Sequence, residues 1–132
     1  MRRGLCIVDA ILDVPITEEQ KAEILAGAVA ALDEDCRTLC ERFVAAGAKD
    51  THWEKVDAST WRFVRHLGDN DSPLQETIWS GPHIKERPED RRYPFAAVFE
   101  GRGRRITVPE AQWTSTVIIF RYDKLAGKWA KL

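Results

Sequence analysis

Apolar residues recur every three or four positions through the first third of the chain, which is the spacing of one face of a helix. They are Ile24, Leu25, Ala28, Val29, Leu32, Cys36, Leu39, Cys40 and Phe43. Thr17 and Gln20 have the spacing of a capping box at the start, and Gly47 suits a left-handed helix end. The pattern predicts one long helix over 17–46, and 32–35 is where so long a helix would break.

Beyond Gly47 apolar and polar positions alternate, which is the period of β-strands. The predicted strands cover 60–67, 74–80, 95–100, 104–108 and 113–122, with 52–56 as a candidate hairpin partner of the first, and a turn at 123–127 leads into 128–132. A charged loop is expected at 81–92, and a hairpin turn at Gly101-Arg102-Gly103. Because no helix separates these strands, we expect them to pair as an antiparallel meander.

A short helix is expected over 5–12, and the whole of 1–132 is expected to form a single α+β domain. In it, one long N-terminal helix packs on a curved antiparallel sheet of five to six strands, since a sheet that wraps the helix buries the apolar surfaces of both. In this order of elements the chain is similar to cystatin-like and nuclear-transport-factor-like cone folds and to START-like helix-grip folds. The similarity is one of architecture, and no motif places the chain in a family.

The predicted strand 113–122 is apolar on both faces. Val117 and Ile119 face one way, whereas Ile118 and Phe120 face the other. A sheet with one solvated face alternates apolar with polar residues, and one helix covers only one face. The second face is therefore expected to be covered by a partner subunit, by the loop 81–92 or by the N-terminal segment. The first of these predicts a homo-oligomer.

Two arginines interrupt apolar faces of predicted strands. Arg65 shares a side with Trp61, and Arg121 shares a side with Trp113. Such an arginine either reaches the solvent at the rim of the sheet or binds a carboxylate or phosphate inside a concave pocket. If the arginines line a pocket, these four residues are the candidate ligand-binding residues.

His52, His66 and Asp57 are the candidate groups for acid–base catalysis, because a His–Asp pair in a cone-shaped cavity can transfer protons. His66 is expected on the sheet face opposite Trp61. An ordinary surface position is the favoured interpretation of each histidine. No nucleophile elbow, phosphate loop or dinucleotide-binding motif is present.

Cys36 and Cys40 lie one helical turn apart on the apolar stripe, where cysteine packs as a small hydrophobic residue. Neither the histidines nor the cysteines have the spacing of metal ligands. The sequence therefore predicts no metal site and no cofactor.

The 132 residues carry a formal net charge of -1, but the charges are separated along the chain. Residues 9–36 hold eight acidic residues and one lysine, whereas 101–132 hold seven basic and two acidic residues. The separation is explained by pairing of helix and sheet, by head-to-tail association, or by a basic surface for nucleic acid. No apolar run has the length of a membrane span or a signal peptide, so we expect a cytoplasmic protein without membrane contact.

These observations favour a non-catalytic binding or regulatory domain that acts through protein–protein association and forms a dimer. The alternative is a small cavity-containing enzyme or ligand-binding protein, with a histidine as general acid or base and an arginine as anion anchor. A second alternative is nucleic-acid binding through the basic C-terminal strands. The sequence leaves open whether the protein is an enzyme.

Overall fold

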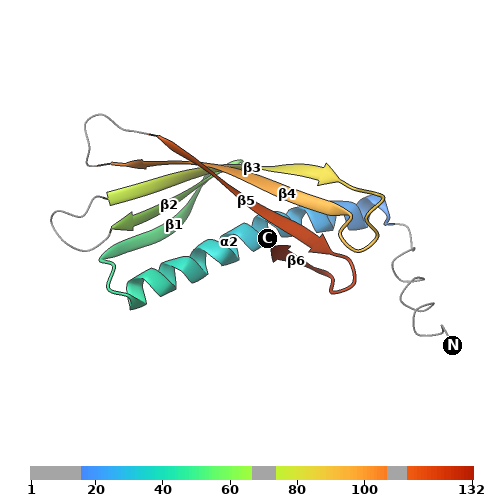
Figure 1. Ribbon diagram of the computed structural model, residues 1–132, viewed down its shortest axis with the longest axis horizontal. Helices are drawn as coiled ribbons and strands as arrows, with labels where there is room; N and C mark the ends of the chain where they lie inside the picture. Colours follow the sequence, from blue (N-terminus) through green and yellow to red (C-terminus); the bar gives the residue numbers. More distant parts are fainter. Residues whose placement is uncertain (1–15, 67–73, 107–112) are drawn as a thin grey trace.

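The computed structural model describes residues 16–66, 74–106 and 113–132, which form one long helix beneath a curled antiparallel sheet (Figure 1). The elements, in chain order, are α2 (Glu18–Ala45), β1 (Asp50–Asp57), β2 (Thr60–His66), β3 (Leu74–Glu86), β4 (Phe95–Arg105), β5 (Thr114–Asp123) and β6 (Lys128–Lys131). Each strand pairs antiparallel with the next. The predicted α+β meander is confirmed, and the short helix expected over 5–12 lies outside the described residues.

The helix α2 begins and ends where its sequence signals stand. The Thr17 hydroxyl accepts a hydrogen bond from the backbone N–H of Gln20, and the Gln20 side chain accepts one from the Thr17 N–H, which forms the predicted capping box. Gly47 adopts the left-handed conformation with φ 100°. The helix runs unbroken over 28 residues, so the break considered at 32–35 does not occur. No helix in the described part of the chain has the length and apolarity to cross a membrane.

The predicted hairpin turn at 101–103 is wrong, because β4 continues through it as one strand of 11 residues. A Cβ atom on Gly101 would lie 2.7 Å from the Trp79 ring, and one on Gly103 would lie 3.3 Å from two threonine hydroxyls. The two glycines therefore allow close approach of neighbouring side chains. A glycine pair is typical of turns as well, and the sequence does not show which tertiary contact it serves.

The charged loop predicted over 81–92 is also partly wrong, because β3 continues to Glu86. The strand passes through a bulge between Ser80 and His83, where Gly81 has φ 131°. Beyond the bulge, Ile84 packs against the core. Ile84 thus gives this charged stretch an inward apolar side chain, and His83 to Glu86 pair with β4.

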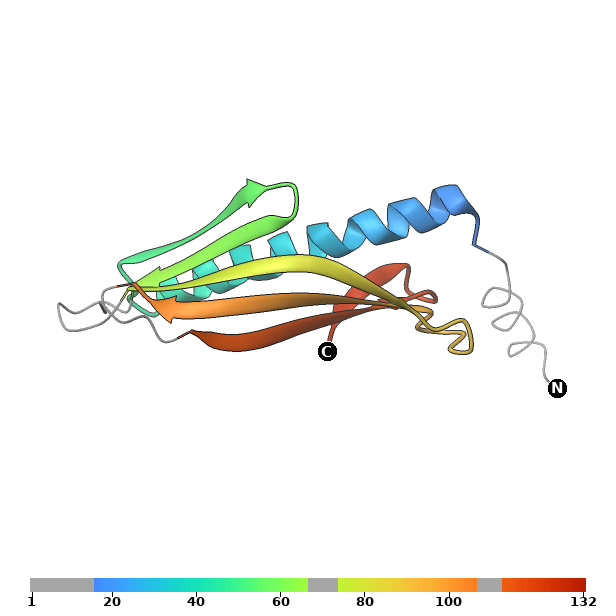
Figure 2. The ribbon, with the colours of Figure 1, turned by 90° about the horizontal axis from the view of Figure 1, so that it is seen from above.

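The sheet curls around α2 and contacts it from both outer strands (Figure 2). From β1, Trp53 Nε1 donates a hydrogen bond of 2.6 Å to the carboxylate of Asp33. From β6, Trp129 Nε1 donates one of 2.7 Å to the backbone carbonyl of Ile24. These two indoles hold the helix in the concavity of the sheet from opposite edges.

The core lies between α2 and the concave face of the sheet. Its centre is the fully buried Phe99, whose ring meets those of Trp61 and Phe120 edge-on at centroid distances of 6.1 and 6.0 Å. The buried members are Ala28, Leu32, Cys36, Trp61, Trp79, Ala97, Phe99 and Phe120. The helix thus supplies small and aliphatic side chains, and the sheet supplies the rings.

The convex face of the sheet is open above much of β5. Ile118 and Phe120 point toward the core, whereas Val117 on the opposite face is 54% exposed. At the far end of β5, Tyr93 covers Arg121, whose guanidinium carbon lies 4.2 Å from the ring centroid. Both faces of this strand are expected to be covered. Within the described residues of one chain, only the face toward α2 is covered along the apolar part of the strand.

Candidate functional site

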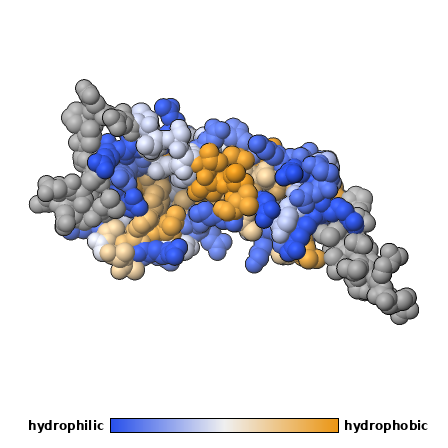
Figure 3. All heavy atoms as spheres, in the orientation of Figure 1, coloured by the Kyte–Doolittle hydropathy of each residue, from blue (hydrophilic) through white to orange (hydrophobic). Residues whose placement is uncertain are grey.

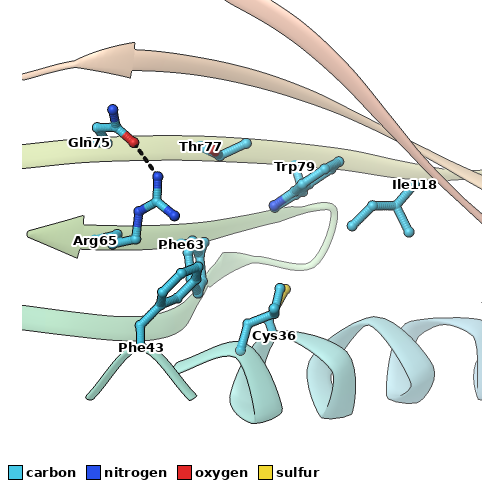
Figure 4. A pocket seen from close by; sticks show the side chains of 9 residues that line it. Cys36, Phe43, Phe63, Arg65, Gln75, Thr77, Trp79 and Ile118 are labelled. Atoms are coloured by element: carbon cyan, nitrogen blue, oxygen red, sulfur yellow. Dashed lines mark hydrogen bonds between the residues drawn. The ribbon is translucent and has the colours of Figure 1, made fainter. Parts of the chain in front are cut away.

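A pocket of about 210 Å³ opens between the C-terminal half of α2 and strands β2 and β3 (Figure 4). Its described lining residues are Cys36, Leu39, Phe43, Phe63, Arg65, Gln75, Thr77, Trp79 and Ile118. The helix supplies the first three, and the concave face of the sheet supplies the rest. They form an apolar chamber with three polar side chains gathered on its sheet wall.

Aromatic rings form most of the apolar wall. The rings of Phe43 and Phe63 meet at a tilt of 53° with 6.2 Å between centroids, and Trp79 closes the inner end. Burial, with Asp35 nearby, raises the pKa of the Cys36 thiol to about 12. This thiol stays protonated at neutral pH, so it lines the pocket and does not act as a nucleophile.

Arg65 is the only charged side chain among the described lining residues of the pocket. Its Nη2 donates a hydrogen bond of 2.7 Å to Gln75 Oε1, and its guanidinium carbon lies 4.5 Å from the centroid of the Phe43 ring. The amide and the ring together fix the plane of the guanidinium. Figure 4 shows its second terminal nitrogen turned toward the space between Phe63 and Trp79.

The electrostatics of this end of the pocket favour an anion. Arg65 is half-buried, and no described carboxylate pairs with it. A guanidinium that faces an apolar space keeps unused N–H donors, and a carboxylate matches two of them at once. The hydroxyl of Thr77 adds a neutral hydrogen-bonding group on the neighbouring strand.

A second, wider depression of about 420 Å³ lies between α2 and β1, beside Trp53 and Trp61. Its polar groups already bind one another. Asp33 accepts the Trp53 indole N–H at 2.6 Å and pairs with Arg37 at 3.3 Å. Because Asp33 and Arg37 pair with each other, this depression offers a ligand fewer free charged groups than the Arg65 pocket does.

The structure separates the four predicted ligand-binding residues between the two faces of the sheet. Arg65 lies in the pocket, whereas Trp61, four residues earlier on the same strand, is buried in the core and borders the second depression. Arg121 stacks on Tyr93 on the convex face, where Trp113 also lies, within about 5 Å of two other guanidiniums. One pocket therefore contains only one of the four.

The predicted catalytic residues do not form a described cluster. His52 is exposed and lies 3.3 Å from Asp50, and Asp57 is at the end of the same strand, about 16 Å along it at 3.3 Å per residue. The Ser59 N–H donates to the Asp57 carboxylate and lowers its pKa, which fits a turn residue that stays ionised. The side chain of His66 lies outside the described part of the structure.

The site residues that sequence reasoning missed are Phe43, Gln75, Thr77 and Trp79. Phe43 stands at the end of the helical stripe, and the register of β2 and β3 places Gln75 directly opposite Arg65. The available sequence signal is Gln75, a polar residue at an inward position of the strand beside Arg65. Reading it requires the pairing register, which the sequence does not show.

Comparisons with protein-family models, with curated proteins and with solved structures found no match for this chain. Figure 3 shows where apolar surface is exposed on one side of the molecule: along the middle of β5 and near the C-terminal end of α2. The chemistry of the pocket and of this surface is therefore what carries a functional proposal.

Proposed function

We propose that this protein is a non-catalytic binding protein whose helix–sheet pocket takes a small ligand with an apolar body and a carboxylate. The observation that carries the proposal is Arg65, held by Gln75 and Phe43 at one end of an apolar pocket without a described acidic partner. None of the described lining residues is a histidine or a carboxylate. The arrangement supports the arginine anion anchor and gives no support to acid–base catalysis by His52 or Asp57.

The size of the pocket limits the ligand. A cavity of 150 Å³ holds benzene, and sites for drug-sized molecules begin at about 300 Å³. At about 210 Å³ the pocket suits one ring, or a short aliphatic chain, with one carboxylate. About ten non-hydrogen atoms at about 0.5 kcal/mol each correspond to a Kd of about 0.2 mM.

The test is an NMR titration of the full chain with benzoate, 3-phenylpropanoate and the neutral benzamide. We expect shifts around the pocket for the two carboxylates and at least tenfold weaker binding of benzamide. Arg65→Met should remove the preference for the carboxylate. Arg62→Met is the matched control, because Arg62 lies on the same strand, pairs with Glu54 and points to the other face.

Equal binding of benzoate and benzamide would contradict the anion anchor. Binding that survives in Arg65→Met and falls in Arg62→Met would place the ligand on the convex face. Absence of shifts with all three compounds at 10 mM would reject the proposed ligand class.

Nucleic-acid binding has one supporting observation. Arg102 and Arg104 both stack on Trp113, with guanidinium carbons 5.0 and 4.9 Å from the ring centroid. However, Glu76 pairs with Arg104 at 2.7 Å, and the stacked arginines occupy the indole that a base would need. Binding to a single-stranded oligonucleotide that collapses between 50 and 200 mM salt would support this second candidate.

A further inference from the structure

Within the described residues, the outer edge of β5 lacks a neighbouring strand over its first five residues, 114–118. β6 pairs with Phe120–Asp123 only, and beyond this pairing the N–H of Leu132 donates to the carbonyl of Ile119 at 2.9 Å. Within the described residues, no strand pairs with 114–118 on that side. Because an unpaired edge presents a row of free backbone donors and acceptors, it is a template for another strand.

The open part of β5, as far as it is described, carries neither charges nor a bulge, two of the features that protect sheet edges. Its first four residues, Thr114 to Val117, are all exposed and uncharged, and no bulge interrupts their pairing with β4. The other edge strand, β1, contrasts with it. Four of its eight residues are charged, and its pairing has a register shift near Asp57. Charges and bulges are among the usual means of preventing edge-to-edge association; β1 has both, whereas Thr114 to Val117 have neither.

Alternation along the strand determines which backbone groups are available. The carbonyl of Ile119 points toward β6, so the N–H and C=O groups of Val117 and Ser115 point toward the same open side. The groups of Thr116 and Ile118 point toward β4 instead. The open edge thus offers the donors and acceptors of alternate residues, in the arrangement that an antiparallel strand requires.

We infer that a second copy of this chain pairs with this edge, β5 against β5, about a two-fold axis at Ser115. In that register Trp113 of one copy lies opposite Val117 of the other, and the pairing stops before Ile119, whose carbonyl is already bonded. A register centred on Thr116 would bring Trp113 against Ile119 and collide with the end of β6. The two-fold centre at Ser115 therefore uses the most free backbone groups.

A second copy suits this edge better than a partner of different chemistry. Antiparallel pairing about a two-fold axis sets the residue on the axis opposite its own equivalent and its neighbours close to theirs, so a charge near the axis would repel its copy. The sequence Thr114-Ser115-Thr116-Val117 has no charge and avoids this repulsion. The exposed side chains of Trp113, at 44%, and Val117, at 54%, lie on the same face and would cover each other.

The expected dimer is weak. A pairing of about five residues per strand buries less than the roughly 1,200 Å² of a standard stable interface. Sedimentation velocity over 5 µM to 1 mM should therefore show a monomer that converts to a dimer as the concentration rises. This inference does not rest on the ligand pocket, because the assembly is measured without any ligand.

Ser115→Pro is the decisive variant, because its lost N–H faces the open edge and not β4. We expect it to stay monomeric up to 1 mM with an unchanged melting temperature. Ser115→Lys, which sets two like charges at the axis, should do the same if the proline disturbs the fold. Ser80→Lys is the matched control, since it adds the same charge to an exposed strand residue away from the edge.

Ser115→Cys tests the register directly. Residues facing each other as a hydrogen-bonded antiparallel pair have Cα atoms about 5.5 Å apart, within the range of a disulfide. Mild oxidation should give a covalent dimer at least tenfold faster than in the unmodified chain. A wild type that stays monomeric at 1 mM, or a dimer that persists in Ser115→Pro and Ser115→Lys, would overturn the inference.

Discussion

The two halves of the helix–sheet interface differ although they share one helix and one sheet. Along residues 27–32 of α2, which we call the closed half of the interface, Ala28 and Leu32 lie fully buried against rings of the sheet, and Trp129 packs over Gly27. Under the C-terminal half, the inward positions of β2 and β3 include Arg65, Gln75 and Thr77, and a pocket remains.

The difference follows from the polarity of the inward residues. Apolar side chains pack without gaps, whereas a buried polar group must keep a hydrogen-bonding partner. Arg65 meets this need through Gln75 and keeps donors for a ligand. We therefore assign stability to the closed half and binding to the open half, and variants in each half test that division.

The largest loss of stability is expected for Leu32→Ala in the closed half. The side chain is fully buried, and its truncation should lower the free energy of unfolding by about 2–5 kcal/mol. Urea unfolding measures the change. Val44→Ala on the exposed side of the same helix is the control and should change it by less than about 0.5 kcal/mol. Similar losses in both variants would contradict the division.

Gly101→Ala should have the next largest effect. The added Cβ would lie 2.7 Å from the rigid ring of Trp79, and overpacking of this kind costs about 1–3 kcal/mol. Gly103→Ala on the same strand meets hydroxyl groups at 3.3 Å and should cost less. The order of the two melting temperatures is the measurement, and a reversed order would refute close packing at Trp79.

Arg65→Met should change stability by less than about 1 kcal/mol, because an apolar side chain of similar length can replace a half-buried charge that has no described ionic partner. Its effect should appear in carboxylate binding instead. Chemical unfolding and ligand titration of the same samples separate the two. A large loss of stability would place Arg65 in the structural half of the comparison.

The smallest effect is expected for Asp123→Asn, and it depends on pH. A hydrogen bond from Arg92 holds the pKa of Asp123 below its usual range. The folded protein thus gains stability from this carboxylate above the pKa of the unfolded chain, near 3.9, and loses it as pH falls through the lowered value. Melting temperatures should differ between variant and wild type at pH 7 and converge toward pH 2. A constant difference would exclude this linkage.

Local signals predicted the parts of the fold that local contacts decide. The capping box at Thr17, the end of α2 at Gly47 and the antiparallel order of the strands all follow from spacing along the chain. The errors at 101–103 and 81–86 share one cause. Glycines and charged residues have the same local preferences in turns as in bulged or tightly covered strands. The Trp79 ring on the neighbouring strand and the packing of Ile84 on the core decide between these structures.

The candidate site was predictable only in part. Alternation along β2 placed Arg65 on the inward face beside Trp61, since the side-chain period of a strand is a local property. It did not show that Arg121 and Trp113 face the other way, because the relative facing of separate strands depends on their pairing. Gln75 joins the site through the same pairing.

Composition and period along the chain are sufficient for one helix, an antiparallel meander and an inward arginine, because propensity and alternation act over a few residues. The pocket, its glutamine and the open edge of β5 arise only when the sheet closes around the helix. Pairing register, curl and the short length of β6 depend on contacts between residues far apart in the chain. Those contacts decide where apolar side chains fill the space between helix and sheet, and where the charge of Arg65 faces an open pocket.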